Sequence, residues 1–156
     1  MAIAGLFLGI IGAVTGVVAL AWQFITWRHS GAVVAVTATA AYPTYGDQVG
    51  DLHVNVNASN SGRSPVTVKG WGLRLPDGRT MITTSPLSWS SPIPHRLEPG
   101  ADGSWFMPAH EIARFSAVHG VRQQDLIAYV NLADGRTINA KARGIGLAYE
   151  YSGETS

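Results

Sequence analysis

The stretch DLHVNVNA at residues 51–58 alternates polar and apolar side chains without a break. Successive side chains of a β-strand point to opposite faces of a sheet, so this alternation is typical of a strand with one buried face. We predict a half-buried strand whose core face carries Leu52, Val54, Val56 and Ala58. The stretch therefore indicates a β-rich fold.

Strand signals continue on both sides of this stretch. Residues 32–41 are rich in Val, Thr and Ala, which favours an earlier strand. In the following strand, 66–75, the apolar residues change parity near Gly70. An extra residue in a strand resets which face points inward, so we predict a β-bulge near Gly70 and a core position for Trp71.

Two segments, 75–80 and 132–137, share the pattern L-x-D-G-R-T. Asp-Gly between apolar strands favours a tight hairpin because glycine tolerates positive φ. We predict a hairpin at each copy, the second one joining strands 125–132 and 136–142.

Between these hairpins we predict a short strand, 103–107, and a brief helix, 108–118, that begins at a proline. Roughly six or seven short strands separated by turn signals favour an all-β, immunoglobulin-like β-sandwich, with a small barrel as the alternative. We expect this domain to span residues 31–147 and the polar residues 148–156 to form a flexible tail.

Residues 2–27 contain no charged side chain. A bilayer core of roughly 30 Å needs about 20 apolar residues in helical form, so we predict a single transmembrane helix over residues 1–28. The position of Arg28 then suggests an inner (plasma) membrane protein whose C-terminal domain lies in the cytoplasm. A signal peptide cleaved after Ala21 is the alternative, although no Lys or Arg precedes the apolar run.

One face of the predicted helix gathers small residues and one amide. Small residues allow a second helix to approach closely, and an amide can form a hydrogen bond across that contact. We predict association with another copy of this chain or with a different protein. The residues expected at that contact are Gly5, Gly9, Gly12, Gly16 and Gln23.

Composition and motifs argue against an enzyme, a metalloprotein or a nucleic-acid-binding protein. The net charge is +1 and only 13% of residues are charged, without the basic cluster that a phosphate-binding face needs. Cysteine is absent, and His110-Glu111 is followed by Arg114 where a zinc-binding helix needs histidine. No nucleophile motif occurs. We therefore predict no catalytic residue, no cofactor and no metal.

The segment 85–96 contains three prolines and is the candidate recognition element. Prolines favour an extended backbone of low entropy, and apolar side chains on it can anchor a partner. The candidate partner-binding residues are Trp89, Pro92, Ile93 and Pro94. In the alternative interpretation, this segment wraps the domain, covers an edge strand and buries Trp89.

Three stretches carry a family resemblance: VNVNASNSGRSPVTVKGWGLRLPDGR (54–79), HRLEPGADGSWFM (95–107) and AYVNLADGRTINAK (128–141). Together with the helix ending in Trp22-Gln23, they resemble small single-span proteins of actinobacteria and their phages. The resemblance covers roughly residues 15–147 and implies a β-sandwich behind an N-terminal helix. It implies no activity and assigns no functional residue.

These observations favour a membrane-anchored, non-enzymatic protein-interaction module with an unidentified protein partner. The phage resemblance suggests superinfection exclusion or a role in lysis, by analogy. The alternative is an accessory subunit of a larger membrane complex, in which the glycine face packs against a foreign helix. A secreted ligand-binding domain released after Ala21 is the third interpretation.

Overall fold

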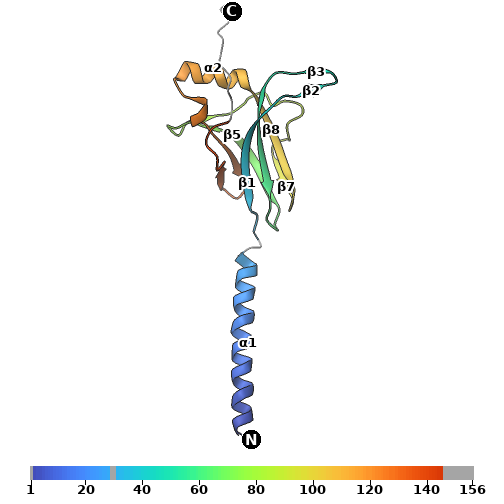
Figure 1. Cartoon of the computed structure of the whole chain (residues 1–156), viewed down its shortest axis with the longest axis vertical. Coiled ribbons are helices and arrows are strands. Elements are labelled where there is room, and N and C mark those ends of the chain that lie inside the picture. The colour runs from blue at the N-terminus through green and yellow to red at the C-terminus, as the bar shows by residue number, and fades with distance from the viewer. Residues whose placement is uncertain (1, 29–30, 146–156) are drawn as a thin grey trace, which may run out of the picture.

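The computed structural model describes residues 2–28 and 31–145, with side chains described from residue 12 onward except at 27–28 and 45. Figure 1 shows a long N-terminal helix and a β-rich part with one shorter helix. The elements are α1 (Ala2–Arg28), β1 (Val34–Ala41), β2 (Thr44–Tyr45), β3 (Gln48–Val49), β4 (His53–Asn60), β5 (Val66–Arg74), β6 (Thr80–Met81), β7 (His95–Leu97), β8 (Asp102–Pro108), α2 (Ala109–His119), the 3-10 turn η1 (Gln123–Asp125), β9 (Ile127–Leu132) and β10 (Thr137–Asn139).

The strands form two main antiparallel sheets and one small ribbon. The first sheet has the order β1-β4-β8, and the second has the order β10-β9-β5-β6. Strand β7 also pairs with β5, along Val66–Val68, whereas β6 pairs with β5 at Leu73 and Arg74. Thus β6 and β7 share one edge of β5. Strands β2 and β3 form the separate ribbon.

The prediction of an immunoglobulin-like sandwich behind a transmembrane helix is wrong. The described residues form mostly β structure, arranged as a half-barrel with two helices. Strand β1 contacts β9 and β10 of the other sheet, and β7 contacts β8. The sheets therefore approach each other along their edges and wrap around one core.

Helix α1 also corrects the predicted location in the membrane. Within the part of the chain that the structure describes, no helix combines the length and the apolar character needed to cross a bilayer. The predicted plasma-membrane location and cytoplasmic C-terminal domain are overturned by this finding.

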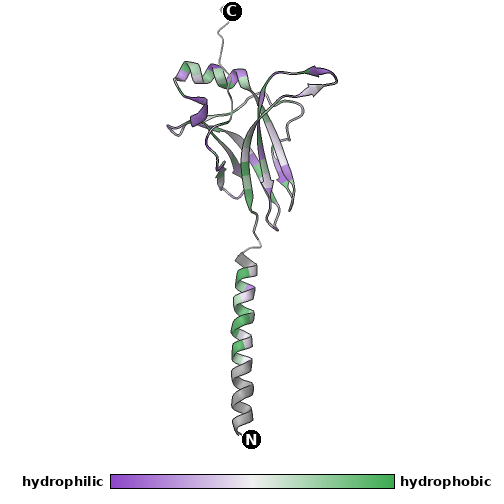
Figure 2. Cartoon of the chain, viewed as in Figure 1, coloured by the Kyte–Doolittle hydropathy of each residue, from purple (hydrophilic) through white to green (hydrophobic). Residues whose placement is uncertain are grey.

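The alternating stretch at residues 51–58 forms β4 as its pattern requires. Val54, Val56 and Ala58 are fully buried, whereas Leu52 is only partly buried and precedes the strand. The predicted bulge is confirmed, because the register between β5 and β9 shifts between Val68 and Gly70. Figure 2 shows the alternating hydropathy along the strands that accompanies this one-sided burial.

The two L-x-D-G-R-T copies form matching turns, as predicted. In the first, the Arg79 backbone N–H and side-chain Nε donate to Asp77 Oδ1 and Oδ2 at 2.9 and 2.7 Å. In the second, Arg136 donates to Asp134 at 3.0 and 2.8 Å in the same way. In each turn the arginine backbone N–H, followed by its side chain, lowers the pKa of the aspartate.

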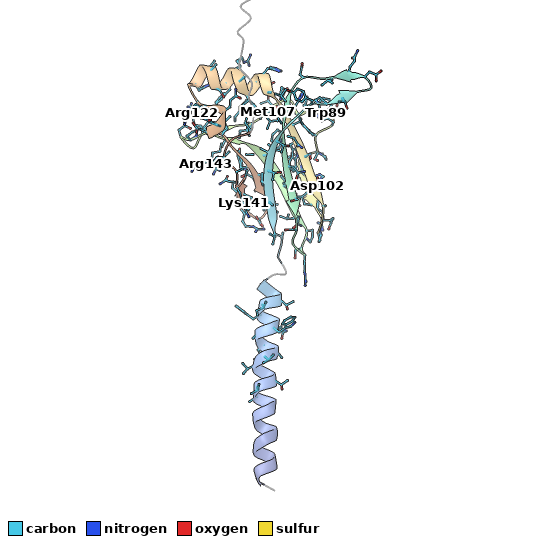
Figure 3. The ribbon with its side chains drawn as sticks, viewed as in Figure 1. Trp89, Asp102, Met107, Arg122, Lys141 and Arg143 are labelled. Carbon is cyan, nitrogen blue, oxygen red and sulfur yellow. The ribbon has the colours of Figure 1, made fainter. Side chains whose placement is uncertain are left out.

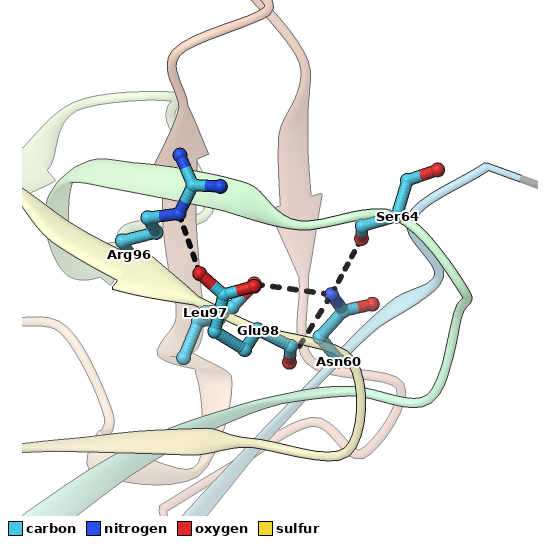
Figure 4. Close-up of polar contacts among 5 residues, drawn as sticks. All are labelled: Asn60, Ser64, Arg96, Leu97 and Glu98. Carbon is cyan, nitrogen blue, oxygen red and sulfur yellow. Dashed lines mark hydrogen bonds and ion pairs between the residues drawn. The ribbon is translucent and has the colours of Figure 1, made fainter.

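Asn60, the last residue of β4, forms hydrogen bonds with the residue before β1, with the turn that follows β4 and with β7. Figure 4 shows its bonds to Ser64, Leu97 and Glu98. Its Nδ2 donates to the carbonyl oxygens of Ser64 and Leu97 at 2.8 and 3.2 Å, while its Oδ1 accepts from the backbone N–H groups of Gly62 and Val33. Asn60 is 1% exposed, so these bonds satisfy a buried amide. This residue fixes the turn before β5 against β7.

Candidate functional site

The segment between β6 and β7, residues 82–94, contains the candidate recognition residues and crosses the edge of β8. Ser91 N–H donates to the Ser104 carbonyl oxygen at 2.8 Å. In return, the Ser104 and Phe106 N–H groups donate to the hydroxyl oxygens of Ser91 and Ser90 at 3.0 and 3.2 Å. The 82–94 segment therefore caps polar groups that an edge strand would otherwise expose, as the alternative interpretation predicts.

Trp89 lies on the outer face of the β1-β4-β8 sheet. It makes edge-on ring contacts with His53, at 5.6 Å between centroids, and with Phe106, at 6.3 Å. His53 Nδ1 lies 2.6 Å from the Asp51 carbonyl oxygen, which orients the imidazole beneath Trp89. Trp89 remains 41% exposed, so the segment covers the strand edge without burying this ring.

A groove lies beside Trp89 and is also lined by Thr44 of the β2–β3 ribbon. Figure 3 labels Trp89 near the place where this ribbon leaves the rest of the β-rich part. Its volume is about 480 Å³. Tyr42, which also lines the groove, is 61% exposed and Trp89 is 41% exposed, so two large aromatic rings are open to solvent here. We call this feature the Trp89 groove; its lining residues are Ala41, Tyr42, Pro43, Thr44, Trp89 and Phe106.

Two aspartates lie close in sequence to the residues that line the Trp89 groove. The segments that border it, 41–51 and 82–94, contain Asp47 and Asp51 and neither Lys nor Arg. Asp47 lies in the turn of the β2–β3 ribbon, and Asp51 follows Gly50, whose N–H donates to the Pro43 carbonyl oxygen at 2.7 Å. Both aspartates are exposed. This arrangement favours a cationic group on anything that occupies the groove.

A second cleft lies on the other side of the 82–94 segment, with a volume of about 520 Å³. Trp71 from β5 and Trp105 from β8 form its inner wall, with their rings stacked at 6.4 Å and 26°. Pro86, Leu87, Pro92 and Ile93 contribute to the outer wall. We call this feature the Trp71–Trp105 cleft.

The structure separates the four predicted partner-binding residues. Trp89 lines the Trp89 groove, whereas Pro92 and Ile93 line the Trp71–Trp105 cleft. Pro94 lines neither one and follows a cis peptide bond. Sequence reasoning missed Tyr42 and Pro43, although an aromatic residue next to proline in a polar turn is a usable signal.

The helix-association residues remain a prediction. Gly12 and Gly16 lie on α1 with open space around them, and Gln23 is exposed on the same helix. The positions of Gly5 and Gly9 fall within α1, but side chains there lie outside the described residues.

Candidate metal ligands are scattered among the residues that the structure describes. No three His, Asp or Glu side chains gather there as metal ligands would. The described groups with shifted pKa values are Asp77, Asp134 and Arg122, and each of them is exposed and has an ion-pair partner. No family model matches the chain, and no curated protein matches it either.

Proposed function

We propose that this chain is a non-enzymatic protein-interaction module. Its Trp89 groove binds an extended, proline-containing segment of a partner protein, with a Lys or Arg beside the prolines. The observation that carries this proposal is that two exposed aromatic residues, Tyr42 and Trp89, both line a groove of about 480 Å³.

Aromatic grooves suit proline-rich segments for a physical reason. A polyproline II segment is already extended and has little conformational entropy to lose on binding. Its flat proline rings pack between aromatic side chains, which is the recognition mode of several small binding domains. Exposed Trp and Tyr are also the residue types that carry the most binding energy at interfaces. The contacts of Trp89 with His53 and Phe106 hold its ring in place, which lowers the entropy lost on binding.

Negative charge near the groove should favour proline-rich segments that carry a Lys or Arg. Asp47 and Asp51 belong to a segment that lines the groove, and the lining segments 41–51 and 82–94 contain no Lys or Arg, so a Lys or Arg of the partner should gain favourable interactions. A neutral proline-rich segment lacks this gain. Because both aspartates are exposed, the preference should weaken as salt concentration rises.

A second candidate function, that of an accessory subunit, is favoured by α1. This helix exposes large apolar side chains that a partner helix could cover. Those residues are Val14, Val17, Val18, Leu20, Trp22, Phe24 and Ile25. Crosslinking of the full chain tests this role: Gly12→Ile and Gly16→Ile should reduce a crosslinked helix pair, and unchanged crosslinking argues against it.

The main proposal is tested by fluorescence anisotropy with labelled ten-residue peptides. One panel carries proline pairs flanked by arginine, and a matched panel replaces each arginine with glutamine. Trp89→Ala and Tyr42→Ala should each weaken binding of the arginine peptides about tenfold or more. Val118→Ala is the control, since Val118 is an exposed apolar residue on α2. Equal binding by wild type and Trp89→Ala, or no binding by either panel, would contradict the proposal.

A further inference from the structure

We propose that the Trp71–Trp105 cleft binds a small planar molecule of fused rings that carries a hydrogen-bond acceptor, such as a carbonyl oxygen. This site is separate from the Trp89 groove and does not depend on a protein partner. Its position, its aromatic wall and one buried polar atom support it.

The cleft opens where an edge of β5 lacks a strand neighbour. Strand β6 pairs with Leu73 and Arg74, and β7 pairs with Val66–Val68, so residues 69–72 between them have no strand partner on this edge in the described part of the chain. The 82–94 segment connects β6 to β7 and passes outside this opening. The β5 bulge lies at the same place. Openings in barrel-like sheets are common ligand sites, and bulges often accompany functional sites.

The inner wall of the cleft suits a flat ring. Trp71 and Trp105 come from different sheets, and their rings are nearly parallel, at 26°. His95 contacts Trp105 edge-on at 6.0 Å, which fixes that indole from another side. Aromatic ligands stack on such faces in offset or edge-on arrangements. The cleft volume of about 520 Å³ falls within the range of small-molecule sites.

A hydrogen-bond donor in this wall has no acceptor. Trp105 is 1% exposed, and its Nε1–H has no hydrogen-bond partner among the described residues. A buried indole N–H normally finds a partner, and leaving it without one destabilises the folded state. Because this nitrogen is closed to water, a ligand carbonyl would supply the missing acceptor by displacing the side chains that cover it. The ligand class is therefore a planar ring system with an acceptor, rather than a hydrocarbon.

The geometry favours a small molecule over a peptide. Trp71 and Trp105 are only 8% and 1% exposed, so a polypeptide backbone with its own donors and acceptors cannot lie along them. The 82–94 segment already covers the outer side of this wall. A rigid ring system can enter between that segment and the indoles without adding unpaired polar groups.

The test compares two bicyclic probes of similar size, coumarin and naphthalene, of which only coumarin has a carbonyl acceptor. Each is titrated into the full chain, and binding is followed by NMR at the tryptophan indole N–H signals. Trp105→Phe should weaken coumarin binding about threefold to tenfold and leave naphthalene binding within about twofold. Ile93→Ser should weaken both probes because it removes an apolar contact on the outer wall. Val118→Ser, remote on α2, should change neither.

A second replacement guards against misfolding of the Trp105→Phe variant. Incorporation of 3-benzothienylalanine at position 105 removes the N–H while keeping the ring size, and it should show the same selective loss of coumarin. The inference is overturned if coumarin affinity is the same in wild type and in both variants at position 105. It is also overturned if neither probe gives a saturable shift. It is also overturned if Trp89→Ala, rather than Ile93→Ser, abolishes binding, since the probes then occupy the Trp89 groove.

Discussion

Trp89 and Trp105 pack on opposite faces of the β1-β4-β8 sheet, yet one is 41% exposed and the other 1%. Trp105 belongs to β8 itself and stacks on Trp71 inside the half-barrel. Trp89 comes from the 82–94 segment and packs on Phe106, the residue after Trp105 in the sequence. Because strand side chains alternate, β8 supports a buried ring on one face and an exposed ring on the other. The comparison separates aromatic residues that maintain the fold from those available to a partner.

Substitutions on the buried inner face should destabilise the fold more than substitutions on the exposed outer face. Leu73 is fully buried beside this aromatic wall, so Leu73→Asp places a charge in the core at a cost of several kcal/mol and should prevent folding of the β domain. Circular dichroism melts of the full chain check this result. Thr80→Asp, at an exposed position of β6, is the control and should melt close to wild type. A cooperative, unshifted β-sheet transition in Leu73→Asp would show that the assigned core face is wrong.

Replacing each of the two tryptophans by alanine tests directly whether Trp105 stabilises the fold more than Trp89 does. Trp105→Ala removes a fully buried ring and should destabilise the domain by about 3–5 kcal/mol. Trp89→Ala removes a half-exposed ring with two edge-on contacts and should cost about 1–2 kcal/mol. Urea denaturation of both variants measures the difference. Similar losses of unfolding free energy for the two variants would mean that Trp89 is also a core residue.

Removing the serine hydroxyl that accepts a hydrogen bond at the edge of β8 should reduce stability by a smaller amount. Ser91→Ala removes the acceptor for the Ser104 N–H at 3.0 Å and should cost about 1 kcal/mol. Hydrogen exchange at the Ser104 amide should accelerate more than exchange at other β8 amides. Ser85→Ala serves as the control, because its side chain is exposed in the same segment. Unchanged exchange at Ser104 would indicate that the hydroxyl does not cap this strand.

The smallest expected effect concerns the two aspartate turns, which belong to neither aromatic face. The folded-state pKa values of Asp77 and Asp134 lie below the ordinary value of 3.8, owing first to the backbone N–H of the following arginine. Their contribution to stability is present above pH 3.8 and is lost as the pH falls through the lowered values. Asp77→Asn combined with Asp134→Asn should therefore reduce the loss of stability below pH 3.8. Acid titration of both proteins measures this difference, and identical curves would contradict it.

Local patterns predicted local structure well. The alternation in β4, the bulge before Gly70 and the two Asp-Gly turns follow from short-range geometry and appear as expected. The two-residue strands β2 and β3 escaped prediction because so short a segment carries no periodic signal. The half-barrel escaped because contacts between sheet edges join residues far apart in the sequence.

The candidate site was predicted in part. Proline content and an aromatic residue identified the 82–94 segment and Trp89. The sequence could not show that Pro92 and Ile93 face a different cleft from Trp89, since this depends on where the segment crosses β8. It also could not show that the Trp105 N–H lacks an acceptor, because that follows from the packing of two sheets. The uncharged N-terminal run was read as a membrane span from composition alone, and the described structure does not support that interpretation.

The most direct test of the binding-module account is an NMR titration of the ¹⁵N-labelled full chain with an unlabelled arginine-flanked proline peptide. The account predicts saturable shifts at the Trp89 indole N–H and at the backbone amides of Tyr42, Thr44 and Phe106, with no shift at Val118 or Asn139. Shifts confined to other residues, or none at millimolar peptide, would contradict it.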